Sequence, residues 1–428
     1  MVVTAHLCYY YINIGWIRMK NNAKALFDYT MNQSASFLFL CEYRLLPKFF
    51  TRKSPLGFMR TVLLVLRMIK KSAKAELMDF FYQVDKGLFI PTRQALSQAR
   101  EKISYLAFKD FFDKSCELAV NGDEPRLFKG FKLFAVDGTS FIVGEMAKLA
   151  KHFSESTTVL GKAMCRISAV VDVLNDCIVN AIVSPFSVGE RALAIKQIGQ
   201  LMSVTNALFL FDRGYWSPEL VSSIIANGQK FLMRLPSNVM KTIVKDANGN
   251  VVKLRRYSFR LPSGETEFLL TNLTEDEMSG DEMAALYAMR WGVETKYLEI
   301  KDRLQIEQFS GASANIVLQD IYSTLYISNL VAFICFESDE AIKERTADKG
   351  NEYEQKTNRS TSIKALRTRF VDICLMTDNR RRNAALERLY FDVSKDVTYI
   401  GKSKPKSRDK RKMKESRRNR RNKHKSVL

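Results

Sequence analysis

The chain has 428 residues, of which 46% are hydrophobic, and a formal net charge of +21. This length favours two or three folded units, and this composition excludes wholesale disorder. Residues 401–428 hold fourteen Lys or Arg against two acidic residues, a net charge of +12, which leaves about +9 for the rest of the chain. Such a balance favours a polyanionic partner, with nucleic acid as the leading candidate. The alternative is a solvated tail that only aids solubility.

Cysteine and histidine are poorly placed for a zinc site, because the seven cysteines form no CxxC pair and there are only three histidines. Free cysteines suit a reducing compartment, and we expect a cytoplasmic protein. Residues 56–69 and 321–336 are apolar but interrupted or short, so they are expected to be core helices, and no membrane partner is expected. Residues 1–30 lack the pattern of a signal peptide, and Met19 and Met31 are alternative starts.

Residues 51–130 are predicted to be helical and to form the candidate DNA-binding region, after an extension over 1–50 that the sequence leaves undefined. Pro91 and Thr92 are good helix-starting residues. The segment that they open carries the polar residues Arg93, Gln94, Gln98, Arg100 and Lys102. This polar face fits DNA contact and an ordinary amphipathic surface helix equally well.

An α/β core is predicted to begin at residue 131. Apolar, β-branched runs predict strands at residues 133–137, 165–174, 177–185, 207–211 and 230–235. Asn175-Asp176 marks a turn between the second and third of these strands. Helical segments at 190–202 and from about Pro218 alternate with the later strands, which favours a mixed sheet.

Residues 237–277 interrupt this alternation and are predicted to be a small β-rich insertion, with turns at Asn248-Gly249 and Ser263-Gly264. The core therefore comprises residues 131–236 and 278–337. The remaining predicted segments are a long helix from Asp281 to Leu304, a helix at 314–337, a polar loop at 338–360, helices within 361–392 as part of a C-terminal helical region over 338–400, and a disordered basic tail over 401–428.

Two predicted strands each end in an aspartate, Asp137 and Asp212. In an open α/β sheet, ligands gather at the carboxyl ends of the strands. An aspartate after four apolar residues is a poor core residue, because burying an unpaired carboxylate is costly. Two such carboxylates repel each other, and a divalent cation such as Mg²⁺ relieves that repulsion. The alternative is that each aspartate caps the turn that follows it.

The predicted helix over 281–304 supplies a third carboxylate. At 100° per residue, one narrow face holds Tyr287, Arg290, Glu294 and Lys301. The apolar stripe beside it is Leu286, Met289, Val293, Tyr297, Ile300 and Leu304. The side expected to face solvent holds Ala288, Gly292, Lys296, Glu299 and Arg303. The alternative for the polar face is a set of helix salt bridges, because Arg290 and Glu294 are four residues apart.

The spacing Tyr287-x2-Arg290-x3-Glu294-x6-Lys301 resembles the Tyr-Arg-Glu-Lys signature of insertion-sequence transposases of the IS-four type. The motifs VDG at Asp137 and FDRGY at Asp212 resemble the two aspartate motifs of that family, and the likeness extends over roughly residues 35–395. The resemblance implies an α/β, ribonuclease-H-like mixed sheet core. In that core Asp137, Asp212 and Glu294 would be catalytic and hold two Mg²⁺ or Mn²⁺ ions.

The resemblance also implies cut-and-paste DNA transposition through a hairpin at the transposon end. The partners would be terminal inverted repeats, target DNA and a second copy of the chain. Residues expected to hold DNA are Tyr287, Arg290, Lys301 and Arg213, of which Arg290 can grip a phosphate by a bidentate fork. For Arg213, a salt bridge to a neighbouring carboxylate is the alternative.

Aromatic residues near these motifs are candidates to stack on an unpaired base, with core packing as the alternative. They are Trp216, Trp291 and, more weakly, Tyr257 and Phe259. Other functions also remain open: a ribonuclease-H-like nuclease without strand transfer, and an inactive DNA-binding transposase relic. An RNA-binding protein is less favoured, because the chain shows no aromatic-rich recognition motif of the usual kind.

Overall fold

The computed structural model describes residues 21–122, 125–144, 147–153, 163–239, 243–245, 249–261, 264–347 and 353–400. The expectations for residues 1–20 and for the basic tail at 401–428 lie outside the described residues.

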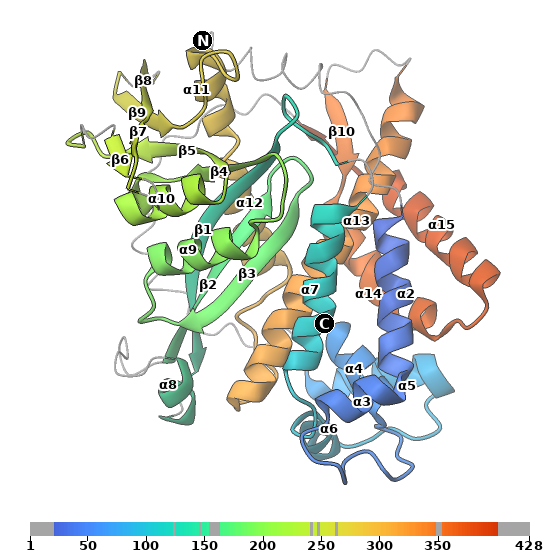
Figure 1. Cartoon of the computed structure of the whole chain (residues 1–428). Helices are drawn as coiled ribbons and strands as arrows, with labels where there is room; N and C mark the ends of the chain where they lie inside the picture. Colours follow the sequence, from blue (N-terminus) through green and yellow to red (C-terminus); the bar gives the residue numbers. More distant parts are fainter. Residues whose placement is uncertain are drawn as a thin grey trace.

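A seven-stranded mixed sheet forms one half of the molecule (Figure 1). Its strands are β1 (Lys132–Gly144), β2 (Ala163–Asp172), β3 (Cys177–Pro185), β4 (Ala207–Phe211), β5 (Lys230–Leu235), β8 (Arg255–Arg260) and β9 (Thr266–Thr271). They lie in the order β3-β2-β1-β4-β5-β9-β8. The β1–β4 and β4–β5 pairs are parallel, and every other neighbouring pair is antiparallel. The predicted mixed sheet is confirmed.

Helices cover both faces of this sheet. α9 (Glu190–Gln200) and α10 (Pro218–Ala226) lie on one face, and α12 (Trp291–Leu298) lies against β1 and β2 on the other (Figure 1). Because both faces are covered, the central strand β4 is buried at every position, which explains its unbroken apolar run. The predicted turn between β2 and β3 is confirmed, with Asp172 accepting hydrogen bonds from the N–H groups of Leu174 (3.0 Å) and Asn175 (3.1 Å).

The other half of the molecule is helical and is built from both ends of the chain. Its helices are α2 (Asn22–Ala35), α3 (Phe37–Tyr43), α4 (Phe58–Leu66), α5 (Ala73–Asp85), α6 (Arg93–Arg100), α7 (Leu106–Asn121), α13 (Ala314–Thr346), α14 (Arg359–Leu375) and α15 (Asn379–Lys395). The short strands β10 (Glu354–Thr357) and β11 (Val397–Ile400) pair beside them. α2 packs on α7 and α14, so this part of residues 1–50, which the sequence left undefined, belongs to the helical half.

α13 is the central helix of this half and contacts α2, α4, α7, α14 and α15. Its length and hydropathy would suffice to cross a membrane, but its most apolar stretch is wholly buried inside the fold. The predicted core helices at 56–69 and 321–336 are therefore confirmed. The predicted loop at 338–360 is wrong at its start, because α13 continues to Thr346. Ser338 and Ile342 are buried there, and the Ser338 hydroxyl bonds to the carbonyl oxygen of Tyr390 on α15 (3.2 Å).

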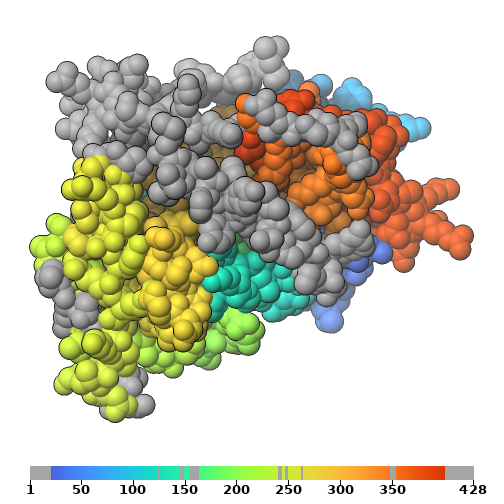
Figure 2. All heavy atoms as spheres, turned by 90° about the horizontal axis from the view of Figure 1, so that it is seen from above, coloured from blue at the N-terminus to red at the C-terminus, as the bar shows by residue number. Residues whose placement is uncertain are grey.

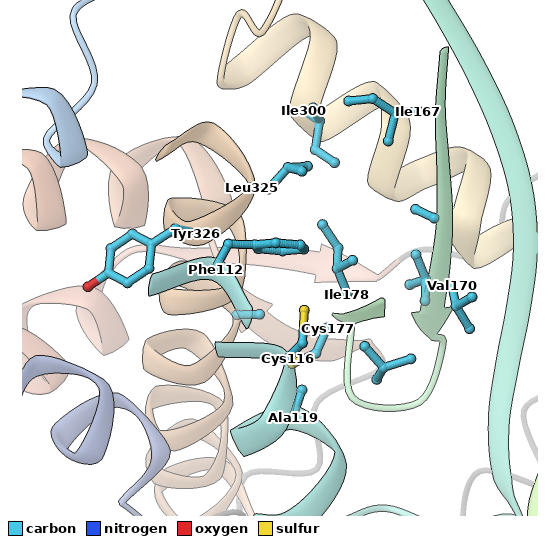
Figure 3. Close-up of a cluster of buried hydrophobic side chains, with 14 of the residues drawn as sticks. Phe112, Cys116, Ala119, Ile167, Val170, Cys177, Ile178, Ile300, Leu325 and Tyr326 are labelled. Atoms are coloured by element: carbon cyan, nitrogen blue, oxygen red, sulfur yellow. The ribbon is translucent and has the colours of Figure 1, made fainter. Parts of the chain in front are cut away.

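The two halves share one hydrophobic core (Figure 3). In it, Phe112 from α7 and Leu325 from α13 lie near Ile178 from β3 and Ile300 from the segment after α12. Seen from above, strands of the region over 237–277 lie at one end of the molecule and the C-terminal helices at the other (Figure 2). The sheet and the helices thus hold one another in place through buried side chains.

The region over 237–277 is β-rich as predicted, and two of its strands belong to the main sheet. β9 pairs with β5 and β8 pairs with β9, so both strands extend the main sheet. Only β6 (Ile243–Lys245) and β7 (Val251–Lys253) form a sheet of their own. Without β9, β5 would leave an unpaired edge. Gly249 and Gly264 have φ of 82° and 88° at the predicted turns, whose preceding residues lie outside the described part.

Candidate active site

The register of β1 and β4 brings Asp137 and Asp212 side by side. Parallel pairing ends at Val136 and Phe211, and the two aspartates are the next residue on each chain. The predicted end of the first strand is wrong, because β1 continues through Asp137 to Gly144 along β2. Only the parallel pairing with β4 ends before Asp137, because β4 itself ends at Phe211. The side chain therefore lies beside a gap in the sheet although its own strand continues.

Asp212 ends β4 by capping the turn η2 (Arg213–Tyr215). Its Oδ1 accepts a hydrogen bond from the N–H of Arg213 at 2.8 Å and from the Tyr287 hydroxyl at 3.3 Å, and the Arg234 guanidinium lies 3.9 Å away. The predicted capping role of Asp212 is therefore confirmed. All three contacts use Oδ1, so capping does not engage Oδ2, and the side chain is 39% exposed. Capping and metal binding are compatible here.

Asp137 occupies a site that opposes its ionisation. Burial raises the pKa of Asp137 to about 6, and the negative charges of Glu294 and Glu190 act in the same direction. A hydrogen bond from the N–H of Gly138 (2.9 Å) and the charge of Arg290 offset this only in part. A divalent cation would reverse the balance, because a nearby positive charge favours the carboxylate form.

Glu294 lies on a segment that is not the continuous helix predicted. The segment consists of α11 (Gly280–Ala288), α12 and the π-helical turn η3 (Glu299–Arg303). Arg290 Nη2 donates a hydrogen bond to Glu294 Oε1 at 3.0 Å, so the i,i+4 ion pair considered from the sequence is present. Burial alone would lower the pKa of Arg290, but Tyr287, Asp212 and Glu294 raise it on balance.

The three carboxylates of the motif thus surround one buried cation. Arg290 is 4% exposed, and its charge acts on Asp137, Asp212 and Glu294. Within the described residues, no group of three acidic, histidine or cysteine side chains is close enough to hold a metal ion. Glu294 is instead paired with Arg290. The three hard carboxylate donors suit Mg²⁺ or Mn²⁺ in kind, provided that Glu294 exchanges Arg290 for the ion.

The remaining predicted DNA contacts lie around this group. Lys301 Nζ is 3.5 Å from the carbonyl oxygen of Ser140 on β1, three residues beyond Asp137. Arg213 is exposed at the start of η2. Tyr287 is only 5% exposed, and its hydroxyl bonds to Asp212, so a bond from Tyr287 to a phosphate requires that contact to open.

The four aromatic candidates differ in how much of their rings is accessible. Trp291 is 46% exposed, and the Arg290 guanidinium lies 5.5 Å from its ring centroid. Trp216 packs partly against the core. Tyr257 and Phe259 stack on each other with centroids 6.3 Å apart. Trp291 therefore offers the most exposed ring beside the carboxylates.

Two tyrosines beside Asp137 were not singled out for the site by the sequence. Tyr297 was assigned to the apolar stripe, yet its hydroxyl is 2.6 Å from the backbone carbonyl oxygen of Asp137. Tyr215 is 3% exposed, and its hydroxyl has no hydrogen-bond partner among the described atoms. Burial, with the nearby charges of Asp137 and Glu190, raises the pKa of Tyr215. Helical and strand periodicity mark both rings as core and carry no signal for their hydroxyls.

Lys296 and Glu299 were expected to face solvent, but both are buried. Lys296 is 1% exposed, and its Nζ lies 3.0 Å from Asp176 Oδ1 and 3.1 Å from Glu299 Oε1. Arg359 of α14 contacts the same two carboxylates. The solvent-facing prediction was wrong because this side of α12 packs against the β2–β3 turn and the helical half.

On α6, neither DNA contact nor an ordinary surface position applies to Arg100. Arg100 is 2% exposed and bonds to Asp320 (2.8 Å) and Gln319 (3.0 Å) of α13. Among the other polar residues of this segment, Arg93, Gln94 and Gln98 are exposed and Lys102 is partly buried.

Comparison with known proteins gives a family for the core. Residues 129–330 match the family model described as transposase DDE domain. The transposase InsG for insertion sequence element IS4 of Escherichia coli (strain K12) is 24% identical over 277 residues, which cover 58% of this chain and 62% of InsG. InsZ of the same strain, named as a candidate transposase, is 22% identical over 175 residues, covering 38% of this chain and 56% of InsZ. The match thus spans less than two thirds of either relative.

Among solved structures, the chain is similar to the piggyBac transposase in a synaptic complex with hairpin DNA, determined by cryo-electron microscopy. The TM-score is 0.44 at 11% sequence identity, and the alignment covers 90% of this chain and 87% of the piggyBac chain.

Proposed function

We propose that the chain is a DDE transposase of the IS4 type, which cuts the ends of a DNA element and joins them to target DNA in a metal-dependent reaction. The register that sets Asp137 and Asp212 side by side at the end of the β1–β4 pairing carries this proposal. α12 brings Glu294 against the same strand. We assign Asp137, Asp212 and Glu294 as catalytic residues that hold two Mg²⁺ or Mn²⁺ ions.

Bound divalent metal would supply an activated water or DNA 3′-hydroxyl and stabilise the leaving oxygen of an in-line displacement at phosphorus. The residues of the chain prepare this chemistry. Asp137 must be ionised to hold a metal, although burial raises its pKa to about 6, and Glu294 must leave Arg290. The released Arg290 can then grip a DNA phosphate by a bidentate fork, while Lys301 contributes a point charge and Arg213 a further contact. Tyr287 donates a hydrogen bond to Asp212 and could bind a phosphate once that contact opens.

We further propose the finer features of the reaction. The ends are cut through a hairpin intermediate, two copies of the chain join two terminal inverted repeats, and residues 51–130 together with the basic tail supply much of the DNA affinity. The net charge of +21 supports a DNA partner, because counterion release from phosphates drives such binding. A hairpin product on a denaturing gel, and joined products with a target plasmid, would distinguish this reaction from that of a simple nuclease.

The test uses the full chain and the DNA that flanks its gene on both sides. Asp137→Ala, Asp212→Ala and Glu294→Ala should each abolish cleavage with Mg²⁺ or Mn²⁺ while DNA binding in EDTA is retained. Glu219→Ala is a matched control, because Glu219 is an exposed carboxylate on α10. If any of the three variants cleaves near the wild-type rate, that residue is not a metal ligand. If all three do, the chain is not a DDE enzyme.

A further inference from the structure

The backbone that carries Asp137 is bonded to a side chain from another element. In an antiparallel ladder, hydrogen-bonded and non-hydrogen-bonded residue pairs alternate. The N–H of Val173 donates to the carbonyl of Leu133 at 3.0 Å. Counting along the register by twos makes Asp137 and Ala169 a hydrogen-bonded pair as well. The Tyr297 hydroxyl bonds to both members of this pair: it accepts from the N–H of Ala169 at 3.1 Å and donates to the carbonyl of Asp137 at 2.6 Å.

This bond is unusual for a buried tyrosine. The two ladder groups can satisfy each other, so the sheet does not need the hydroxyl. The ring, with the residue 7% exposed, packs in the core as a phenylalanine would. The shortest bond of the hydroxyl is the one to the carbonyl of Asp137 at 2.6 Å, while the carbonyl oxygen of Ile167 lies farther away at 3.4 Å. This difference points to a function in the placement of Asp137.

Tyr297 also lies on the helix that carries Glu294. It follows Glu294 by three residues in α12, so the two side chains leave the helix within one turn of each other. The hydroxyl thus joins the element that holds one carboxylate to the backbone of the other. The bond to Asp137 uses only the backbone carbonyl, which leaves the Asp137 carboxylate available to a ligand.

We propose that Tyr297 is a positioning residue that sets the separation of Asp137 and Glu294 for metal binding. The inference rests on the proposed function, because it takes these carboxylates as metal ligands. Two ligands on different elements must be held close to the geometry of the bound ion, and a misplacement of about 1 Å can cost on the order of 10²-fold in rate. Groups that orient metal ligands without touching the ion typically change metal affinity about 10–100-fold when removed.

The test is Tyr297→Phe, which removes one oxygen and keeps the ring. Mn²⁺ affinity, measured by titration calorimetry on the full chain, should fall about 10–100-fold. Cleavage should be lost at low Mn²⁺ and recover at high Mn²⁺, while the melting temperature and DNA affinity in EDTA stay near wild type. Incorporation of 4-aminophenylalanine at position 297 restores a donor to the Asp137 carbonyl and should restore Mn²⁺ affinity, which a purely structural role of the ring does not predict.

Tyr326→Phe is the matched control. Tyr326 is also fully buried, and its hydroxyl bonds to Thr30 at 2.7 Å in the helical half, away from the carboxylates. It should bind Mn²⁺ like the wild type. If Tyr297→Phe binds Mn²⁺ and cleaves normally while Asp137→Ala is inactive, the positioning role is overturned and the proposed function stands. If Asp137→Ala itself binds Mn²⁺ and cleaves normally, the proposed function fails first.

Discussion

Replacing Lys296 by methionine should destabilise the fold more than any single surface ion pair can. Its ammonium group is completely buried between Asp176 and Glu299. Burial alone would lower the pKa of Lys296, but the two carboxylates raise it on balance, so the lysine is charged at neutral pH. Methionine fills a similar volume without the charge, and Arg359 still contacts both carboxylates.

The magnitude follows from what is left behind. Removing one partner of a buried ion pair costs about 3–5 kcal/mol, because a charge stays buried without compensation. Asp176 is 35% exposed and Arg359 remains, so the lower end, about 3 kcal/mol, applies. With an unfolding entropy of about 2.1 cal/mol/K per residue over the 354 residues that the structure describes, this loss lowers the melting temperature by about 4 °C.

Thermal unfolding followed by circular dichroism, together with urea denaturation at pH 7, measures this loss. Lys71→Met is the control, because Lys71 contacts Asp79 at 3.0 Å while both side chains are more than 40% exposed. Exposed pairs contribute about 0–1 kcal/mol, so the control should melt within about 1 °C of the wild type. Equal losses in the two variants would refute the reasoning, since burial would then not distinguish the two lysines.

Three further outcomes are expected. Arg290→Ala and Lys301→Ala should weaken binding to element ends or hairpin formation, as measured by gel shift and denaturing gels; early melting of the variants would instead support a purely structural ion pair. Deleting residues 401–428 should reduce the slope of log affinity against log salt equally for element ends and random DNA; a loss confined to element ends would mean that the tail reads sequence. Burial raises the pKa of Asp172 to about 6, so its contribution to stability is complete below about pH 4 and declines as pH rises through 6. Asp172→Asn should flatten the urea-unfolding stability between about pH 4 and pH 6, and an unchanged profile would contradict that pKa.

The strands and the two aspartate motifs could be predicted because their signals are local. An unbroken apolar run before Asp212 predicts a buried strand, and its end marks where the side chain can reach solvent. The end of β1 could not be placed in the same way. The residues after Asp137 still pair with β2, while only the partner on the other edge is lost. A single sequence does not show which of two neighbours a strand keeps.

Buried charges were mispredicted for a related reason. Lys296 pairs with Asp176, which lies in the β2–β3 turn, and Arg100 pairs with Asp320, which lies on α13. In each case the partner is more than a hundred residues away in the sequence. A helical wheel assigns charged residues to solvent unless the partner is known. The same limitation applies to Tyr297. Its ring follows the apolar period of the helix, while its hydroxyl bonds to the carbonyl oxygen of Asp137, 160 residues earlier in the chain.

Arg290 links these observations to the reaction. In the structure its guanidinium pairs with Glu294 and partly neutralises carboxylates that would otherwise repel each other. A metal at the proposed site would take over that neutralisation and free the guanidinium. A buried Arg290 without a partner would be costly, and a DNA phosphate beside the site offers it one. Metal and DNA should therefore each strengthen the binding of the other, because each supplies the counter-charge that the other displaces. On a helical wheel the Arg290–Glu294 pair looks like an ordinary surface interaction. At this site it would reduce the repulsion between the carboxylates until metal and DNA are both bound.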